Sequence, residues 1–278
     1  MDIAILLTVY NRKETTIHSL NSLYNLINKD LYNSYDIYMT NDGCTDGTEE
    51  SVKQLYPQIN IINHKGNLFW SRGMNLAWKT AIKTKEYDYF LWFNDDATLY
   101  PNALEILLHQ TKHKDNTNTI ITGAFCDSNG NVSYGGKNKL HQLITPNGKY
   151  QEVYYMNGNF VIIPNYIYKE LGIIDKIFTH GLGDYDYGLR AQKTGLKVLL
   201  TPEYIGETNR HDNDLMPYFS YQYSILERFK FLYAPKYSTI PRFKFTCRYK
   251  GFFRAIISFL YGNICTLFPF IHSLRIKI

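Results

Sequence analysis

Residues 3–12 read Ile-Ala-Ile-Leu-Leu-Thr-Val-Tyr-Asn-Arg, an aliphatic run that becomes polar at its carboxyl end. The continuous run Ile3–Val9 predicts a buried strand, because it is too short for a buried helix. The polar residues that follow then lie where a strand passes into the next helix.

The stretches after this strand alternate between amphipathic and apolar segments. Apolar residues at helical spacing predict a helix directly after the strand, and Pro101 fits the first turn of a later one. This β-α-β-α order predicts a mostly parallel sheet with helices on both faces. The expected elements of the first half are 3–9, 12–28, 35–40, 47–55, 59–62, 71–83, 87–93 and 101–113.

The second half is less regular. Short strand signals occupy 119–163, and helices are expected over 164–171, 184–194 and 213–233. Pro235 and Pro241 bracket a linker, after which the composition becomes basic and aromatic. The predicted organisation is a body over 1–234 followed by a linker and helical tail over 235–278.

The composition fits one large domain, or one domain with an appendage. Of the 278 residues, 45% are apolar and 20% are charged, so a sizeable core can form and general disorder is excluded. The four cysteines include no CxxC pair. This excludes a zinc ribbon and a dense disulfide framework, and it fits a reducing compartment.

The charge is distributed unevenly. Residues 241–278 hold seven of the 30 basic residues and none of the 25 acidic ones, so the tail is +7 and the remainder is −2. The body is therefore not expected to bind nucleic acid, whereas the tail suits an anionic partner. Met1 leads into Asp2 and an apolar strand without a basic n-region, so a cytoplasmic location is expected.

Three predicted strands end in polar sequences, where open α/β sheets bind their ligands. These sequences are Thr8-Val9-Tyr10-Asn11-Arg12, the segment 41–48 (Asn-Asp-Gly-Cys-Thr-Asp-Gly-Thr) and Asn94-Asp95-Asp96. Turn chemistry explains part of this pattern, and Asp46 and Thr48 fit a turn and a helix cap.

The acidic pair Asp95-Asp96 needs a further explanation. Adjacent carboxylates after a very apolar strand raise each other's pKa unless a cation lies near them. A hard divalent ion with oxygen ligands is the simplest compensation.

Taken in this order, and with Gly-Asp-Tyr-Asp-Tyr-Gly-Leu-Arg at 183–190, the motifs resemble the family 2 glycosyltransferases of the GT-A fold. The resemblance covers roughly residues 3–211. The segment 66–75 is similar to the family's glycine-rich donor-site segment, and its Asn67-Leu68-Phe69-Trp70 resembles bacterial rhamnosyltransferase-like members. It implies that 1–115 binds a nucleotide sugar and that 116–234 holds the acceptor and the catalytic group.

The resemblance also implies roles for residues on the donor side. Asp42 matches the acid that contacts the nucleobase or ribose, and Asp96 matches the metal ligand of the DxD site. Asn94 departs from a strict DxD, which leaves Asp95 as the contact to ribose or sugar. The other expected donor contacts are Thr8, Tyr10, Arg12, Asn67, Arg72 and Asn94.

On the acceptor side, Asp184 matches the general base, with Gly183 in place of the family's preceding Glu. From the residues alone, an N-terminal helix cap is an equal alternative for Asp184. His180, Tyr185 and Asp186 are candidate acceptor contacts, although loop packing or a structural role fits His180 and Asp186 as well.

The expected metal is Mn²⁺ or Mg²⁺. By position, His211 matches the His that completes the metal site in some relatives, and imidazole favours Mn²⁺. A surface-loop His is an equal alternative.

The uncharged stretch 255–274 is nominally long enough to span a bilayer, but Gly262-Asn263, Pro269 and His272 weaken a continuous helix. Two short amphipathic helices broken near Gly262-Asn263 are expected instead. With 241–278 basic, they predict binding to the inner face of the cell membrane. Alternatively, these aromatics pack on the body or on a second copy in a homodimer.

Together these observations predict a metal-dependent, inverting glycosyltransferase of cell-surface polysaccharide synthesis. It would transfer a sugar from a UDP- or dTDP-linked donor to a glycan hydroxyl, with the glycan attached to a lipid. A sugar-1-phosphate nucleotidyltransferase would want glycines after the first strand, where Thr8–Arg12 has none. A non-catalytic glycan-binding scaffold on the same fold is the other alternative.

Overall fold

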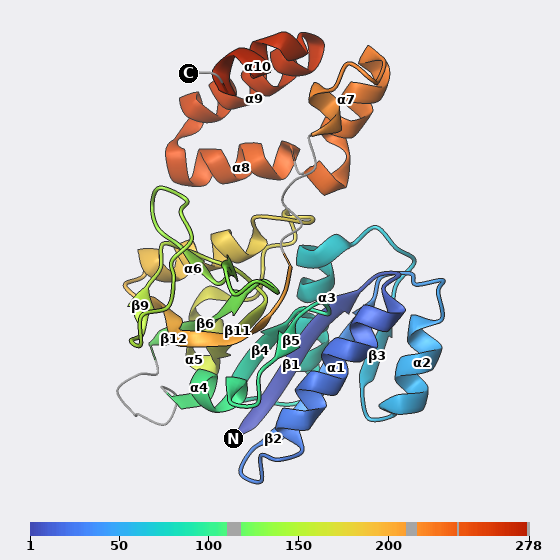
Figure 1. The fold of residues 1–278 in the computed structure, drawn as a ribbon, viewed down its shortest axis with the longest axis vertical. Helices are drawn as coiled ribbons and strands as arrows, with labels where there is room; N and C mark the ends of the chain where they lie inside the picture. The colour runs from blue at the N-terminus through green and yellow to red at the C-terminus, as the bar shows by residue number, and fades with distance from the viewer. Residues whose placement is uncertain (110–117, 210–215, 238, 277–278) are drawn as a thin grey trace.

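The computed structural model describes residues 1–109, 118–209, 216–237 and 239–276. An α/β body forms the larger part of the molecule, and a layer of helices from the C-terminal segment lies on one side of it (Figure 1).

The N-terminal half of the body alternates between strands and helices. Its elements are β1 (Asp2–Val9), α1 (Lys13–Ile27), β2 (Ser34–Asn41), α2 (Thr48–Leu55), β3 (Asn60–Asn63), α3 (Phe69–Thr84) and β4 (Tyr89–Phe93). β1 pairs in parallel with β2 and β4, and β2 pairs in parallel with β3. Because parallel neighbours need a crossover connection, a helix lies between successive strands. The strands and helices predicted here are confirmed, with small shifts at their ends.

After β4 the sheet becomes mixed, because β11 runs antiparallel to both of its neighbours, β4 and β6. The remaining body elements are β5 (Thr98–Leu99), α4 (Ala103–His109), β6 (Thr119–Cys126), β7 (Val132–Tyr134), β8 (Gly136–Lys137), β9 (Gln151–Glu152), β10 (Tyr155–Met156), β11 (Phe160–Pro164), α5 (Asn165–Leu171), α6 (Gly183–Lys193) and β12 (Lys197–Glu207). In the described residues, ten strands form one sheet with the main order β3-β2-β1-β4-β11-β6-β12-β5. The predicted α/β class, a mostly parallel sheet flanked by helices, is confirmed.

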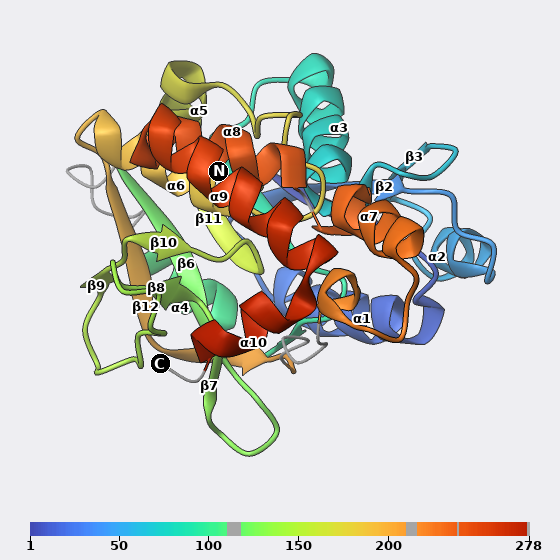
Figure 2. The same cartoon turned by 90° about the horizontal axis from the view of Figure 1, so that it is seen from above.

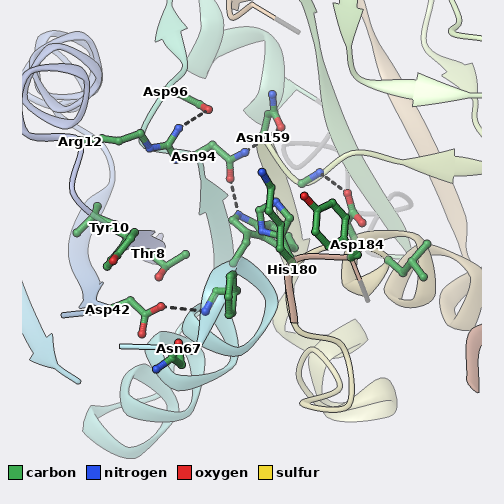
Figure 3. A pocket seen from close by; sticks show the side chains of 18 of the residues that line it. Thr8, Tyr10, Arg12, Asp42, Asn67, Asn94, Asp96, Asn159, His180 and Asp184 are labelled. Carbon is green, nitrogen blue, oxygen red and sulfur yellow. Dashed lines mark hydrogen bonds and ion pairs between the residues drawn. The ribbon is translucent and has the colours of Figure 1, made fainter. Parts of the chain in front are cut away.

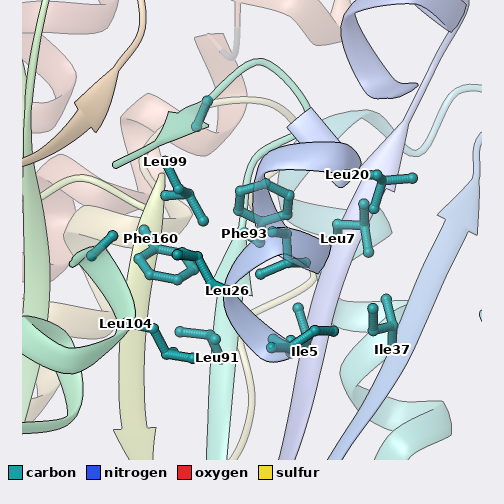
Figure 4. Packing of buried hydrophobic residues seen from close by; sticks show 14 of the residues in the cluster. Ile5, Leu7, Leu20, Leu26, Ile37, Leu91, Phe93, Leu99, Leu104 and Phe160 are labelled. Atoms are coloured by element: carbon teal, nitrogen blue, oxygen red, sulfur yellow. The ribbon is translucent and has the colours of Figure 1, made fainter. Parts of the chain in front are cut away.

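Two apolar clusters pack on opposite faces of this sheet. Alternate side chains of β1 divide between them, so that Ile5 and Leu7 belong to one cluster and Ala4 and Leu6 to the other. Figure 4 shows the first cluster, with Leu20 of α1 beside the strand residues. Both faces of β1 are therefore buried, which explains its continuous aliphatic sequence.

The C-terminal segment folds as the helical layer, which crosses over the body in Figure 2. The layer contains η3 (Pro217–Phe219), α7 (Ile225–Tyr233), η4 (Pro235–Tyr237), α8 (Thr239–Lys250), α9 (Phe252–Leu267) and α10 (Pro269–Ile276). α7 packs against α8 and α9, and α10 packs on α9. The structure thus groups α7 with the tail helices, so a division at 234/235 separates it from its packing partners.

The helix expected over 213–233 is shorter than predicted, and residues 213–215 lie outside the described part of the chain. η3 and a turn precede α7, which begins after Ser224. Ser224 and Glu227 form a capping box, in which the Ser224 backbone N–H donates to Glu227 Oε2 over 2.9 Å. This cap explains why the helix begins there.

The helix break expected near Gly262-Asn263 is also in the wrong place. α9 continues through both residues, and the Asn263 amide donates to the Phe259 carbonyl one turn earlier over 2.8 Å. The break falls at Phe268, because Pro269 starts a new helix without needing a backbone N–H. Within the described residues, no helix has the length and apolar character needed to cross a membrane.

Candidate active site

A cleft of about 1130 Å³ opens at the carboxyl ends of β1, β2 and β4, the edge where a parallel sheet presents its loops. In Figure 3, Asp42 and Asn67 lie on one side of the cleft and Asp184 on the other, with Asn94 and His180 between them. The predicted site residues that line the cleft are Thr8, Tyr10, Arg12, Asp42, Asn67, Asn94, Asp96, His180, Asp184 and Tyr185.

Arg12 lies against the acidic pair after β4. Its guanidinium donates to Asp95 Oδ1 over 2.6 Å and to Asp96 Oδ2 over 2.9 Å, and Thr16 donates to the other Asp95 oxygen. Asp95 is 2% exposed, and burial raises its pKa to about 7, while Arg12 opposes this shift and Asp96 adds to it. A cation does compensate the acidic pair, and in this structure it is Arg12. Asp95 does not line the cleft, whereas Asp96 does.

Asn94 is held by two neighbours. Its Oδ1 accepts a hydrogen bond from the Trp70 indole over 2.6 Å, and its Nδ2 donates to Asn159 Oδ1 over 2.9 Å. The amide can accept from one partner and donate to the other, whereas a carboxylate at this position could not donate to Asn159. Asn94, which stands at the first Asp position of the DxD motif, therefore fits both of its neighbours.

Asp42 caps the N-terminus of α3. Its carboxylate accepts the backbone N–H groups of Leu68, at 3.0 Å, and of Phe69, at 2.9 Å. The side chain is nearly fully buried and still borders the cleft. Asp42 thus fixes the start of α3 beside the position expected for the nucleotide.

Asn67 and Arg72 lie on either side of the start of α3. Asn67 has a φ of +70°, in the left-handed region that Asn tolerates, and it borders the cleft. Arg72 points elsewhere, and its Nε donates to the Lys176 carbonyl over 3.0 Å. The structure does not bring Arg72 into the cleft with the other predicted donor contacts.

Asp184 lies at the start of α6, where it accepts the backbone N–H groups of Tyr185 over 2.9 Å and Gly158 over 3.2 Å. Protein surrounds the carboxyl except towards the cleft, and this burial raises its pKa to about 6, although both N–H groups oppose the shift. Gly183 precedes it because a Cβ there would lie 2.5 Å from Ser71 Oγ, so a Glu does not fit.

His180 and Tyr185 lie near Asp184. The His180 ring packs edge-on against Phe69 at 6.1 Å, and burial lowers its pKa, helped by the positive charges of Lys236 and Arg12. Tyr185 packs against Tyr155 with ring centroids 4.9 Å apart. Both residues border the cleft, as predicted.

Asp186 does not face the cleft and is not an acceptor contact. Its side chain is fully buried, and its oxygens bind Arg190 over 2.9 Å, the Tyr249 hydroxyl over 2.8 Å and Arg248. Residues two apart on a helix point in different directions, which separates Asp186 from Asp184. Asp186 instead ties α6 to α8.

The described residues include no cluster of three or more His, Cys, Asp and Glu side chains suited to a metal ion. His211, the second predicted ligand, lies outside the described part of the chain. Asp96 does border the cleft with a carboxylate. The Asp96 carboxylate alone fits Mg²⁺ or Mn²⁺ only when a substrate helps to hold the ion. Such ions are often bound through one or two carboxylates plus phosphate oxygens.

Several cleft residues were not predicted from the sequence. Gly158 lies between Asn157 and Asn159, and a Cβ there would lie 2.4 Å from the Trp70 ring. A glycine flanked by two Asn residues was a usable signal for a tight backbone approach. Lys236 and Arg242 also line the cleft, and no sequence motif marks them.

Comparison with known sequences and structures gives a consistent result. Residues 4–172 match the sequence profile of Glycosyl transferase family 2. An uncharacterized glycosyltransferase of Rickettsia bellii is 28% identical over 135 residues, which is 48% of this chain and 18% of that protein. One of Rickettsia conorii is 30% identical over 132 residues, which is 46% of this chain and 20% of that protein. The chain spans about a fifth of the length of these curated relatives.

Two solved structures resemble the fold. S. aureus TarS 1–349 in complex with UDP-GlcNAc superposes with a TM-score of 0.57 at 13% identity, covering 84% of this chain and 64% of that chain. GalNAc-T7 with UDP, GalNAc and Mn²⁺ gives a TM-score of 0.56 at 13% identity, covering 86% and 47%. At this identity the likeness concerns the fold, which is that of GT-A glycosyltransferases.

The profile match covers more than half of the chain, and it includes the three strand ends that form the cleft. Together with the GT-A fold, this establishes that the chain belongs to Glycosyl transferase family 2.

Proposed function

We propose that this enzyme transfers a sugar, with inversion, from a UDP- or dTDP-linked donor to a hydroxyl group of a glycan. The observation that supports this most directly is the position of Asp184, whose carboxyl borders the cleft with its pKa raised to about 6. A base with such a pKa is ionised at neutral pH and still accepts a proton effectively.

The other two acids in the described lining of the cleft are engaged by a helix N-terminus or by an arginine, which favours Asp184 as the base. Among the described lining residues, Asp42 caps α3 and Asp96 binds Arg12.

The Asp184 carboxylate takes the proton of the acceptor hydroxyl while the acceptor oxygen bonds to the anomeric carbon. The bond from that carbon to the phosphate oxygen breaks, and the diphosphate leaves with the electron pair. A single displacement of this kind inverts the anomeric centre.

The donor would lie across the ends of β1, β2 and β4. Thr8, Tyr10, Asp42 and Asn67 border one side of the cleft, where the base and ribose would bind. TarS with UDP-GlcNAc and GalNAc-T7 with UDP share this fold, which supports a nucleotide-sugar donor. The Asn67–Trp70 segment favours a deoxyhexose as the sugar.

We also propose that a divalent ion, Mn²⁺ or Mg²⁺, binds with the donor at Asp96. GalNAc-T7, which has the same fold, holds Mn²⁺. Such an ion supplies Lewis-acid stabilisation of the departing diphosphate. Arg12 holds Asp96 in the structure, so this guanidinium would have to share or release the carboxylate when donor and ion arrive.

Calorimetric titration of UDP and dTDP, with and without Mn²⁺ or Mg²⁺, tests the donor site on wild type and Asp96→Ala. Binding of one nucleotide that depends on the metal and on Asp96 supports the proposal. If neither nucleotide binds under any metal condition, the proposed donor site is wrong.

The helical layer favours a lipid-linked acceptor and binding to the inner face of the cell membrane. On α9, Phe253, Ile257, Leu260 and Ile264 repeat at helical spacing with exposures of 80%, 66%, 53% and 47%. The opposite face of α9 is buried, including Ala255. An exposed apolar face on a segment with seven basic residues and no acid matches an anionic bilayer surface.

Binding of this kind would bring the cleft close to the membrane, because the layer with the apolar stripe also lines the cleft. A glycan growing on a membrane lipid would then reach Asp184 from the same side. Flotation with anionic and zwitterionic vesicles tests the proposal. Binding to anionic vesicles supports it, whereas a dimer that buries the α9 stripe and does not bind vesicles contradicts it.

A further inference from the structure

The helical layer supplies one wall of the cleft. Lys236 and Tyr237 come from η4 and Arg242 comes from the first turn of α8, and all three line the same cavity as Asp96 and Asp184. Two of the three carry a positive charge at a site where the proposed reaction releases a diphosphate.

A hydrogen bond to the body holds the start of η4. The buried Thr179 hydroxyl donates to the Pro235 carbonyl oxygen over 2.7 Å. The Thr179 carbonyl in turn accepts the backbone N–H of Ser71, in the first turn of α3, over 2.9 Å. Lys236 is therefore held against the loop that leads into Asp184.

No acidic residue in the described part of the chain pairs with either basic residue. Among the described residues, neither Lys236 nor Arg242 forms an ion pair, and both side chains are exposed. Arg12, in contrast, is bound to the acidic pair, and Arg248 is bound to Asp186. Two cations on the wall of a cleft and without an anion suit an anionic ligand.

Lys236 lines the cleft together with His180 and Arg12. Besides burial, the Lys236 ammonium and the Arg12 guanidinium both lower the pKa of His180. Arg12 follows β1, whereas Lys236 belongs to the layer on the other side of the cleft. The two cations thus belong to different walls of one cleft.

We propose that Lys236 and Arg242 form a diphosphate-binding subsite that the helical layer adds to the cleft. The inference rests on the proposed function, in which the donor carries a diphosphate; an acceptor glycan joined to its lipid through a diphosphate would be a second source of the same chemistry. An ammonium and a guanidinium donate charge-assisted hydrogen bonds to phosphate oxygens. On the donor they would stabilise the charge of the leaving group. On the acceptor lipid they would hold the diphosphate while the glycan extends towards Asp184.

Isothermal titration of four probes tests this subsite: inorganic pyrophosphate, UDP, dTDP and farnesyl diphosphate. The proteins are the wild type, the double variant Lys236→Met/Arg242→Met, and Lys244→Met as a matched control. Lys244 is exposed on the same helix as Arg242 but does not line the cleft. Thermal melting curves check that each variant is folded, and Lys236→Met alone replaces the double variant if the latter is not.

We expect the double variant to bind pyrophosphate roughly tenfold or more weakly than the wild type and the control, since two charge-assisted contacts are lost. An equal loss for UDP with unchanged farnesyl diphosphate assigns the subsite to the donor, and the reverse result assigns it to the acceptor lipid. Equal affinities of wild type and double variant for every probe overturn the subsite, as does a wild type that binds none of them.

Failure of the proposed function gives a different result. In that case the wild type binds pyrophosphate through Lys236 and Arg242 but binds neither UDP nor dTDP more tightly than pyrophosphate. The subsite then stands without a nucleotide donor.

Discussion

Asp184 combines burial, two backbone donors and access to the cleft in one carboxyl group. Burial raises its pKa from the usual value of about 4 to about 6, because the charged form loses hydration. The base must be deprotonated to act, so activity falls as the pH drops through about 6 and is constant above it. We expect log kcat/KM to rise with pH below 6 and to level off near neutrality, as measured in a pH–rate profile.

Removing the charge at the same position tests the role directly. Asp184→Asn keeps the size of the side chain, but its single amide oxygen can accept only one of the Tyr185 and Gly158 N–H groups, which bind different carboxylate oxygens. We expect kcat to fall by about 10²–10⁴-fold while nucleotide affinity stays unchanged, because general-base assistance is lost. Unchanged turnover in Asp184→Asn, or a profile without a transition near pH 6, would mean that another group takes the proton.

Asp42 has a structural role that can be separated from any contact to the nucleotide. Because its carboxylate accepts the first N–H groups of α3, Asp42→Ala should lower the free energy of unfolding by about 1 to 2 kcal/mol. Urea denaturation measures this, with Glu170→Ala as a comparison, because Glu170 is exposed and has no hydrogen bond or ion pair of its side chain among the described residues. A variant that loses nucleotide binding at full stability would show that the cap contributes nothing.

The sequence allowed the donor side of the site to be predicted, because residues that follow parallel strands meet at one edge of the sheet. Asp42 and Asp96 were found in this way. For Asp186 the sequence left an acceptor contact and a structural role open, and the buried position of this residue agrees with the structural role. Lys236 and Arg242 had no signal, because only the tertiary position of the helical layer brings them to the cleft.

At the level of elements, Arg248 joins α8 to α6 and to the loop before it. It donates to the fully buried Asp186 and, over 2.9 Å, to Asp175. We expect Arg248→Met to lower the free energy of unfolding by roughly 1 to 3 kcal/mol, less than for a fully buried pair, because Arg248 is 36% exposed and Arg190 still binds Asp186. Hydrogen exchange should also become faster in α8.

Arg254→Met is the control for this prediction, since Arg254 is an exposed residue of the neighbouring α9 with no ion pair in the described part of the chain. If Arg248→Met and Arg254→Met melt at the same temperature, the link between α6 and α8 does not stabilise the layer.

Local sequence predicted the strands and helices of the body because hydrophobic period and length agree there. β1 and β4 are short, aliphatic or aromatic, and buried on both faces. The local sequence predicted the helices of the helical layer less well. Gly262 and Asn263 resemble a break, but i,i+4 hydrogen bonds from Asn263 and Thr266 support the helix through them. Packing of α9 on α8 and α7 outweighs this weak local preference.

In the whole molecule, the helical layer connects two surfaces. Its inner side completes the cleft with Lys236 and Arg242, and its outer side presents the apolar stripe of α9. An interaction on the outer side can therefore position the acceptor without changing the residues around Asp184. Activity towards lipid-linked and water-soluble acceptors should respond differently to changes in the stripe.

The double variant Phe253→Ser/Ile257→Ser tests this coupling. Full burial of either side chain is worth about 1.5–3 kcal/mol, so we expect binding to anionic vesicles to weaken by at least tenfold. Leu31→Ser, which removes an apolar side chain that is 86% exposed on the body, should bind like the wild type. Transfer to a lipid-linked acceptor in vesicles should fall with binding, whereas transfer to a soluble acceptor should not change. Equal losses for both acceptors would place the effect in the active site rather than at the membrane, because only a change near Asp184 acts on both reactions.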